Sequence, residues 1–156
     1  MPTASEREAW IQTIRQFPEQ LEALVKPLSP AQLHEQKPVD PWTVAQIVHH
    51  CADSHLNSFV RLKLTLTEDR PPLKGYDQDA WAVMVDEANA PIEPSLAILS
   101  GLHQRWVAVF ESLDGDDWER VGMHSESGEM SVNYLLSGYA KHCEDHLAQI
   151  QNILDS

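Results

Sequence analysis

The sequence predicts an all-α protein, a four-helix bundle with short extra helices and long connecting loops. Four long segments place apolar side chains three and four residues apart, which is the spacing of one face of a helix. No segment shows the alternation of apolar and polar residues that marks a half-buried strand, and no internal repeat is present. With 156 residues, the chain has the length of a single domain. We therefore expect one bundle over residues 1–156.

The first helix is predicted over residues 5–17. Its apolar face comprises Trp10, Ile11, Ile14 and Phe17. Pro18 can open a further helical turn, because proline is tolerated at the start of a helix but not in its interior. Ser29 followed by Pro30 is typical of a helix cap and first turn, so a short helix should follow to about Glu35.

The second long helix has the clearest start. Thr43 and Gln46 are spaced as a capping box, in which each side chain satisfies a backbone N–H of the other residue. Apolar residues then recur to about Leu66 without a helix breaker. Residues 68–78 contain prolines and a glycine and predict a loop, and residues 77–84 predict a short helix.

Two further long helices complete the bundle. The third, over residues 95–113, follows a proline-containing break and ends near Gly115. Residues 120–130 hold two glycines and several small polar residues, which predicts a short hairpin or a plain loop. Ser131 then caps a last helix that runs to about Leu154.

The composition excludes several classes of protein. Lysine and arginine number 11 against 24 acidic residues, a formal net charge of −13, so no nucleic-acid partner is expected. No apolar stretch is long enough to cross a bilayer, and the N-terminus lacks the pattern of a signal peptide. Two cysteines cannot build a disulfide scaffold, which favours a reducing compartment. We expect a cytoplasmic protein without a membrane partner.

Eight histidines are present, and two of them lie four residues apart in the last helix. His142 and His146 would share one face about one turn apart, as two imidazoles that bind one metal ion require. Random placement of the histidines already yields roughly 0.4 such pairs, so the spacing alone is weak. Flanking apolar residues indicate that both rings point into the bundle, where polar groups need partners. The alternative is a pair of core histidines bonded to carbonyls or carboxylates.

A third ligand is available from the second long helix, which carries His49, His50 and His55. His49 lies about 100° and His55 about 140° around the helix from His50, so the three cannot all face one ion. The face of His50 carries many polar groups for a core helix, which indicates a wet pocket. Spacing alone does not choose between His49 and His50.

Several motifs resemble the YfiT branch of the DinB-like metalloprotein superfamily. The resemblance extends in order and with compatible gaps from about Trp10 to Ile150. The motifs are Trp42-Thr-Val-Ala-Gln-Ile-Val-His-His-Cys-Ala-Asp-Ser-His-Leu-Asn57, Leu66-Thr-Glu-Asp69, Tyr76-Asp-Gln-Asp-Ala-Trp81, Leu102-His-Gln-Arg-Trp106 and Tyr139-Ala-Lys-His-Cys-Glu-Asp-His-Leu-Ala-Gln-Ile150.

The resemblance implies a four-helix bundle, usually dimeric, in which three histidines bind a divalent metal. Aligned on the paired histidines of the second long helix, the ligands fall on His50, His142 and His146. The chain departs from the family pattern before and between the last two of them. There it has Lys141, Cys143, Glu144 and Asp145. These departures leave the ligands in place but would change the pocket lining or the metal preference.

Three imidazoles with an open fourth position are typical of a catalytic zinc site. We expect one divalent ion per chain, zinc first, with nickel, iron or manganese as alternatives. Bound water could attack an ester or amide, or a bound small thiol could attack an electrophile as thiolate. The resemblance favours the second mechanism, since YfiT-like proteins are implicated in bacillithiol S-transfer. We therefore predict a homodimeric thiol transferase that acts on small-molecule electrophiles. A metal-dependent hydrolase is the first alternative, and a non-catalytic metal- or small-molecule-binding protein is the second.

Three charged residues are candidates for supporting roles. Asp53 could orient a ligand imidazole as a hydrogen-bond acceptor, or be a solvated helix carboxylate. Arg61 and Arg105 could bind the carboxylate of a substrate or thiol cofactor, with surface ion pairing as the alternative. Tyr76 and Trp81 belong to a loop that could cover the pocket or simply pack.

The remaining cysteines and histidines have no predicted chemistry. Cys51 and Cys143 each follow a proposed ligand by one residue, so they point away from the metal and should act as small buried hydrophobes. A redox pair is the alternative. His34, His103 and His124 are expected to be structural or exposed.

Overall fold

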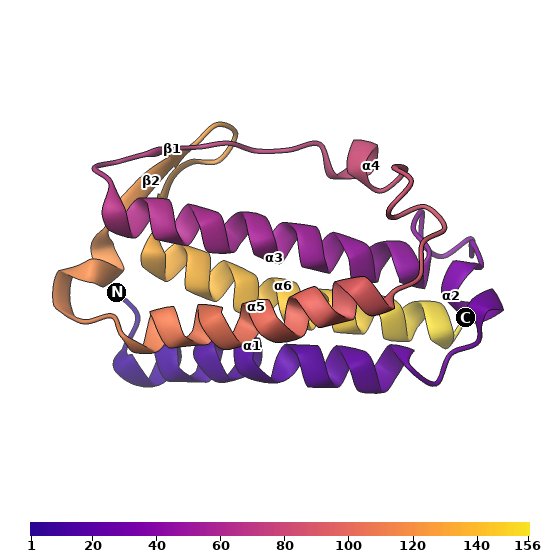
Figure 1. Ribbon diagram of the computed structural model, residues 1–156. Coiled ribbons are helices and arrows are strands. Elements are labelled where there is room, and N and C mark those ends of the chain that lie inside the picture. The colour runs from indigo at the N-terminus through magenta and orange to yellow at the C-terminus, as the bar shows by residue number, and fades with distance from the viewer.

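The computed structural model describes residues 1–156 and confirms the four-helix bundle. The long helices are α1 (Ala4–Val25), α3 (Val44–Thr67), α5 (Glu93–Glu111) and α6 (Val132–Leu154). They lie side by side along one axis, with α3 on the upper side and α1 on the lower side of Figure 1. Both α1 and α3 pack against α5 and α6, so α1 and α3 occupy opposite corners of the bundle.

Short elements connect the long helices. They are α2 (Pro30–His34), α4 (Gln78–Trp81), a 3₁₀ turn (Gly115–Glu119) and the strands β1 (Pro72–Leu73), β2 (Val121–His124) and β3 (Gly128–Ser131). β2 and β3 form the antiparallel hairpin that was one of the two alternatives for this segment. β1 adds to β2 in parallel, and its two residues are too few to show an alternating pattern in the sequence.

Side-chain caps fix where the site-bearing helices begin. Thr43 Oγ1 accepts a hydrogen bond from the Gln46 N–H at 3.2 Å, and Gln46 Oε1 accepts one from the Thr43 N–H at 2.9 Å. Ser131 Oγ accepts from the Tyr134 N–H at 3.1 Å at the start of α6. Both predicted caps are confirmed, and they satisfy backbone N–H groups at the start of each helix.

The expected helical start at Pro18 is wrong, because α1 continues through this residue without interruption. A proline inside a helix removes one hydrogen bond, the one to the carbonyl oxygen four residues earlier. Here that oxygen belongs to Ile14, and it has another donor, His103 Nδ1, at 2.6 Å. The apolar side chains on either side, Phe17 and Leu21, are fully buried, and this packing holds the two halves of α1 in line.

The core lies between the four long helices and includes both cysteines. Cys51 and Cys143 are free thiols with no exposed surface, as expected of small buried hydrophobes. Burial raises the pKa of both thiols well above the ordinary value, so neither is a ready nucleophile. No helix combines the length and the apolar character needed to cross a membrane.

Candidate metal centre

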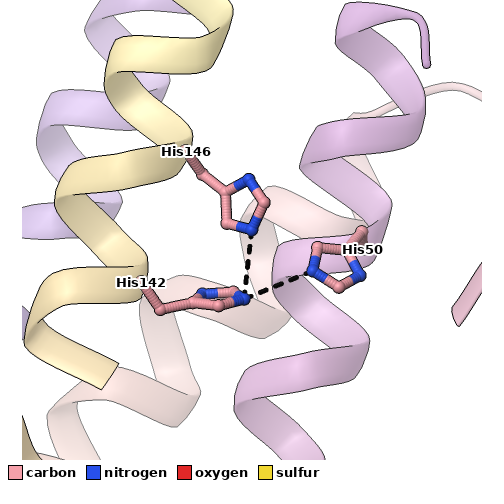
Figure 2. A group of neighbouring side chains, drawn as sticks. All are labelled: His50, His142 and His146. Carbon is pink, nitrogen blue, oxygen red and sulfur yellow. Dashed lines mark hydrogen bonds between the residues drawn. The ribbon is translucent and has the colours of Figure 1, made fainter. Parts of the chain in front are cut away.

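Three histidines from two neighbouring helices converge at one point. His142 and His146 lie one turn apart on α6, and His50 faces them from α3 (Figure 2). The Nε2 atom of His142 lies 3.2 Å from Nε2 of His50 and 3.1 Å from Nε2 of His146. A set of ligand atoms, one from each residue, fits within 4.8 Å, and no carboxylate or thiolate belongs to this group.

His49 and His50 lie in different surroundings. His49 is buried on the side of α3 that faces α5, where its Nδ1 lies 2.7 Å from Ser95 Oγ and its Nε2 lies 3.3 Å from the Ala90 carbonyl oxygen. Both of its ring nitrogens therefore have protein partners away from the centre. His50 alone of this adjacent pair points toward α6.

The three imidazoles are neutral at pH 7. Burial lowers the pKa of His50 to about 4 and that of His142 to about 2, and the neighbouring imidazoles add to both shifts. Burial also lowers the pKa of His146. A neutral imidazole has one nitrogen with a free lone pair, which is the form that binds a metal.

The amide of Gln149 determines which nitrogen of His146 carries the proton. Gln149 Nε2 donates a hydrogen bond to Asp40 Oδ2 at 2.7 Å, so the amide oxygen faces the other way. That oxygen lies 2.7 Å from His146 Nδ1 and accepts its proton. The lone pair of His146 is consequently on Nε2, which points into the centre.

The second nitrogen of His142 begins a chain of histidines. His142 Nδ1 lies 3.0 Å from His55 Nε2, and His55 Nδ1 lies 2.7 Å from His103 Nε2. The chain ends where His103 Nδ1 meets the Ile14 carbonyl oxygen. His55 and His103 are 0% and 2% exposed, so these bonds are shielded from water.

The donor set fits a divalent metal ion. Three imidazoles with no fourth protein ligand are the donors of catalytic zinc sites, in which water or substrate takes the remaining position. Hydroxyl groups border this position: Ser54 Oγ lies 3.4 Å from His142 Nε2 and 3.2 Å from the Tyr139 hydroxyl. Trp42 covers His50, with 4.8 Å between the ring centroids.

The segment between α3 and α5 covers this part of the bundle. Gln46 on α3 donates a hydrogen bond to the Ala82 carbonyl oxygen at 2.8 Å, and Tyr76 packs on Trp81 with 4.3 Å between ring centroids. Burial raises the pKa of Tyr76 to about 12, while a hydrogen bond with Ser54 and the charge of Arg61 oppose the shift. Tyr76 therefore lies beside the hydroxyl groups at the centre.

The three charged candidates lie in different surroundings. Asp53 is half-buried on α3 and hydrogen-bonds Glu87 of the covering segment, while the Nδ1 atoms of His142 and His146 bond to His55 and Gln149. Arg61 is buried at 8% exposure, and its Nη2 donates to the Lys74 carbonyl oxygen at 2.7 Å. Arg105 is exposed and lies over the Phe59 ring at 5.2 Å. Asp53 and Arg61 therefore both contact the covering segment, through Glu87 and Lys74.

The sequence and the fold both have known counterparts. The sequence matches the DinB superfamily over residues 13–150. This chain belongs to the DinB superfamily. The resemblance to its YfiT branch is confirmed by YfiT from Bacillus subtilis, a solved structure described as a probable metal-dependent hydrolase with an unusual four-helix bundle topology. The two chains superpose with a TM-score of 0.93 at 34% identity, covering 98% of this chain and 88% of YfiT.

Curated relatives in the superfamily have the same description. A protein of Oceanobacillus iheyensis named "Putative metal-dependent hydrolase" is 41% identical over 144 residues, which is 92% of this chain and 83% of the relative. A Bacillus cereus (strain B4264) protein with the same description is 40% identical over 146 residues, 94% of this chain and 84% of the relative. These DinB superfamily members are named for metal-dependent hydrolysis, not for thiol transfer.

Four residues that contact the histidines of the centre, directly or through a neighbour, had no supporting role in the sequence-based predictions. They are His55, His103, Gln149 and Asp40. His55 was set aside because it cannot face the same ion as His50. In the structure it contacts the second ring nitrogen of His142. Pro18 was the available signal for His103, since a proline inside a helix leaves a buried carbonyl oxygen in need of a donor.

Proposed function

We propose that this DinB superfamily protein is a metal-dependent hydrolase whose ion is held by His50, His142 and His146. The convergence of three neutral imidazole nitrogens without a fourth protein ligand carries this proposal. A divalent ion at such a site acts as a Lewis acid and lowers the pKa of a coordinated water from 15.7 to about 7. The descriptions of YfiT and the curated relatives support the same reaction class.

The protein groups around the open position have defined tasks in this proposal. The imidazoles remain neutral, so protons do not compete for the ligand nitrogens at pH 7. The Ser54 and Tyr139 hydroxyls lie where they can orient a substrate carbonyl by hydrogen bonding. Trp42 and the Tyr76–Trp81 pair shield the site from bulk water, which strengthens polar interactions inside it.

The test uses untagged protein that is stripped with a chelator and reloaded separately with zinc, nickel, iron or manganese. Each form is assayed on a panel of small esters and amides, with and without an added low-molecular-weight thiol. We expect hydrolysis that requires metal and is independent of thiol. Turnover of an electrophile such as monochlorobimane only when bacillithiol is added would replace the hydrolase with the thiol transferase. A loaded protein that turns over neither class would indicate a binding protein.

Arg61 provides a prediction about the substrate. This guanidinium is buried, takes part in none of the ion pairs of the protein, and has an Nε without a hydrogen-bond partner. A substrate carboxylate would supply the missing charge and acceptor. We expect Arg61→Gln to raise KM for a carboxylate-bearing ester by about 10–100-fold, because this factor corresponds to the free energy of one charged hydrogen bond.

Arg105→Gln is the matched control, because Arg105 is exposed and its guanidinium lies over the Phe59 ring. It should leave KM unchanged for the same ester. A neutral ester of equal size should be hydrolysed by the wild type and both variants with KM values within about twofold, since it makes no charged hydrogen bond. Equal losses on charged and neutral esters would show that Arg61 has a structural role only.

A further inference from the structure

Pro18 leaves the Ile14 carbonyl oxygen without its usual donor inside the helix. In an uninterrupted helix, the N–H of residue 18 would bond to the Ile14 carbonyl oxygen, but proline has no N–H. His103 on α5 fills this position with its Nδ1 at 2.6 Å from the oxygen. A carbonyl oxygen can only accept a hydrogen bond, so the proton of this bond belongs to His103 Nδ1.

The position of this one proton determines the next two. A neutral imidazole has one N–H and one lone pair, so His103 Nε2 must accept, and its donor is His55 Nδ1 at 2.7 Å. His55 Nε2 must then accept in turn, and its donor is His142 Nδ1 at 3.0 Å. The remaining nitrogen of His142 is Nε2, which has its lone pair directed at His50 and His146 (Figure 2).

We propose that Pro18, His103 and His55 are positioning residues that hold His142 in the tautomer whose Nε2 binds the metal. The chain starts at Ile14 on α1 and passes through α5 and α3 to α6, so every long helix contributes one member. Metal-ligating histidines usually donate their second N–H to a carboxylate, carbonyl or water. Here two neutral rings connect the ligand to a carbonyl, so the support adds no negative charge to the centre.

The rings have little freedom to reverse this arrangement. Phe17 packs against both His55 and His103, with centroid distances of 5.1 and 5.5 Å. Trp106 packs against the same two rings at 5.5 and 5.4 Å. Reversing the protons would leave the Ile14 carbonyl oxygen buried without a donor, because its helical partner is a proline.

The first test needs no metal. Nitrogen-15 NMR of the metal-free wild-type protein distinguishes the two neutral tautomers of each histidine. We expect His142, His55 and His103 all to carry the proton on Nδ1. Finding the proton on Nε2 of His142 would overturn the inference. In Pro18→Ala the new N–H competes for the Ile14 oxygen, and the His103 signals should shift toward a mixture of tautomers.

The second test measures zinc affinity, and it rests on the metal site of the proposed function. His103→Phe keeps the ring packing and removes both hydrogen bonds, so we expect the zinc Kd to rise by about 10–100-fold, as for the loss of other supporting partners. His49→Phe is the matched control, because His49 is equally buried but bonds only Ser95 and Ala90. Its Kd should stay within about twofold of the wild type, since it lies outside the chain.

The two proposals fail in different ways. If the wild-type protein binds no zinc, the proposed metal site is contradicted, while NMR of the same protein would still determine the tautomer of His142. Equal zinc affinities of His103→Phe and His49→Phe would overturn the positioning role and leave the metal site intact. If His103→Phe does not fold, His103→Gln replaces it, because glutamine keeps a donor and an acceptor. Its zinc Kd should exceed that of the wild type by less than the increase expected for His103→Phe.

Discussion

Replacing His142 with alanine should reduce bound metal from about one ion per chain to less than about 0.2, because the site loses its central ligand. His142 Nε2 is within 3.2 Å of both other ligand nitrogens, so the remaining pair cannot hold an ion in the same position. Hydrolysis should fall by at least about three orders of magnitude, since the removed chemistry includes the activated water. Elemental analysis and ester turnover of untagged protein measure the two effects.

The control for this variant is His49→Ala, which removes a buried histidine whose ring nitrogens bond Ser95 and Ala90 instead of facing the centre. The His49→Ala protein should still bind about one metal ion per chain, because its substituted side chain lies outside the centre. Zinc at about 100 times Kd should stabilise the wild type and this control by about 2.7 kcal/mol, and His142→Ala should gain nothing. A His142→Ala protein that is folded and still binds one zinc with wild-type affinity would contradict the assigned ligand set.

Glu87 should make the stability of the protein depend on pH. This carboxyl is 3% exposed, and burial, its hydrogen bond with Asp53 and the charges of Asp53 and Asp86 raise its pKa from 4.5 to about 8. The folded state thus keeps a proton that the unfolded state releases above pH 4.5. The associated stability is complete below pH 4.5, declines as the pH rises, and is lost above about pH 8.

Glu87→Gln removes this titration but keeps a donor toward Asp53. Relative to the wild type, the variant should gain stability progressively between pH 4.5 and 8. The total gain should be on the order of 2 kcal/mol, since solvent screening reduces the full linkage energy. Urea unfolding at several pH values measures the difference. Asp79→Asn, an exposed change in the same segment, should show no such trend. A pH-independent difference for Glu87→Gln would mean that Glu87 is ionised in the folded protein.

Local signals predicted most of the fold. The capping box at Thr43 and the cap at Ser131 predicted two helix starts, and the three-four spacing of apolar residues located all four long helices, although it ended the first at Phe17 instead of Val25. The error at Pro18 has a physical reason, because a backbone rule was applied without knowing that packing and a distant histidine compensate for the lost bond. β1 depends on pairing with a strand about 50 residues away, which no local pattern encodes.

The candidate site was predictable only in part. His142 and His146 follow from helical periodicity within one segment, whereas the choice of His50 required the family resemblance or the structure. His55 and His103 lie on different helices and touch only after the bundle has formed. The sequence also does not separate Arg61 from Arg105, because burial and exposure on a helix depend on which face meets its neighbours.

The histidine chain also specifies how the helices align. Apolar helix faces tolerate sliding, since one apolar contact can replace another, whereas a buried polar contact has a single satisfied arrangement. A shift of α6 by one turn, about 5.4 Å, would separate His142 from His55. The same shift of α5 would take His103 away from the Ile14 oxygen. The hydrogen bonds of the histidine chain therefore favour one register of the helices, and this register is the one that brings His50, His142 and His146 together.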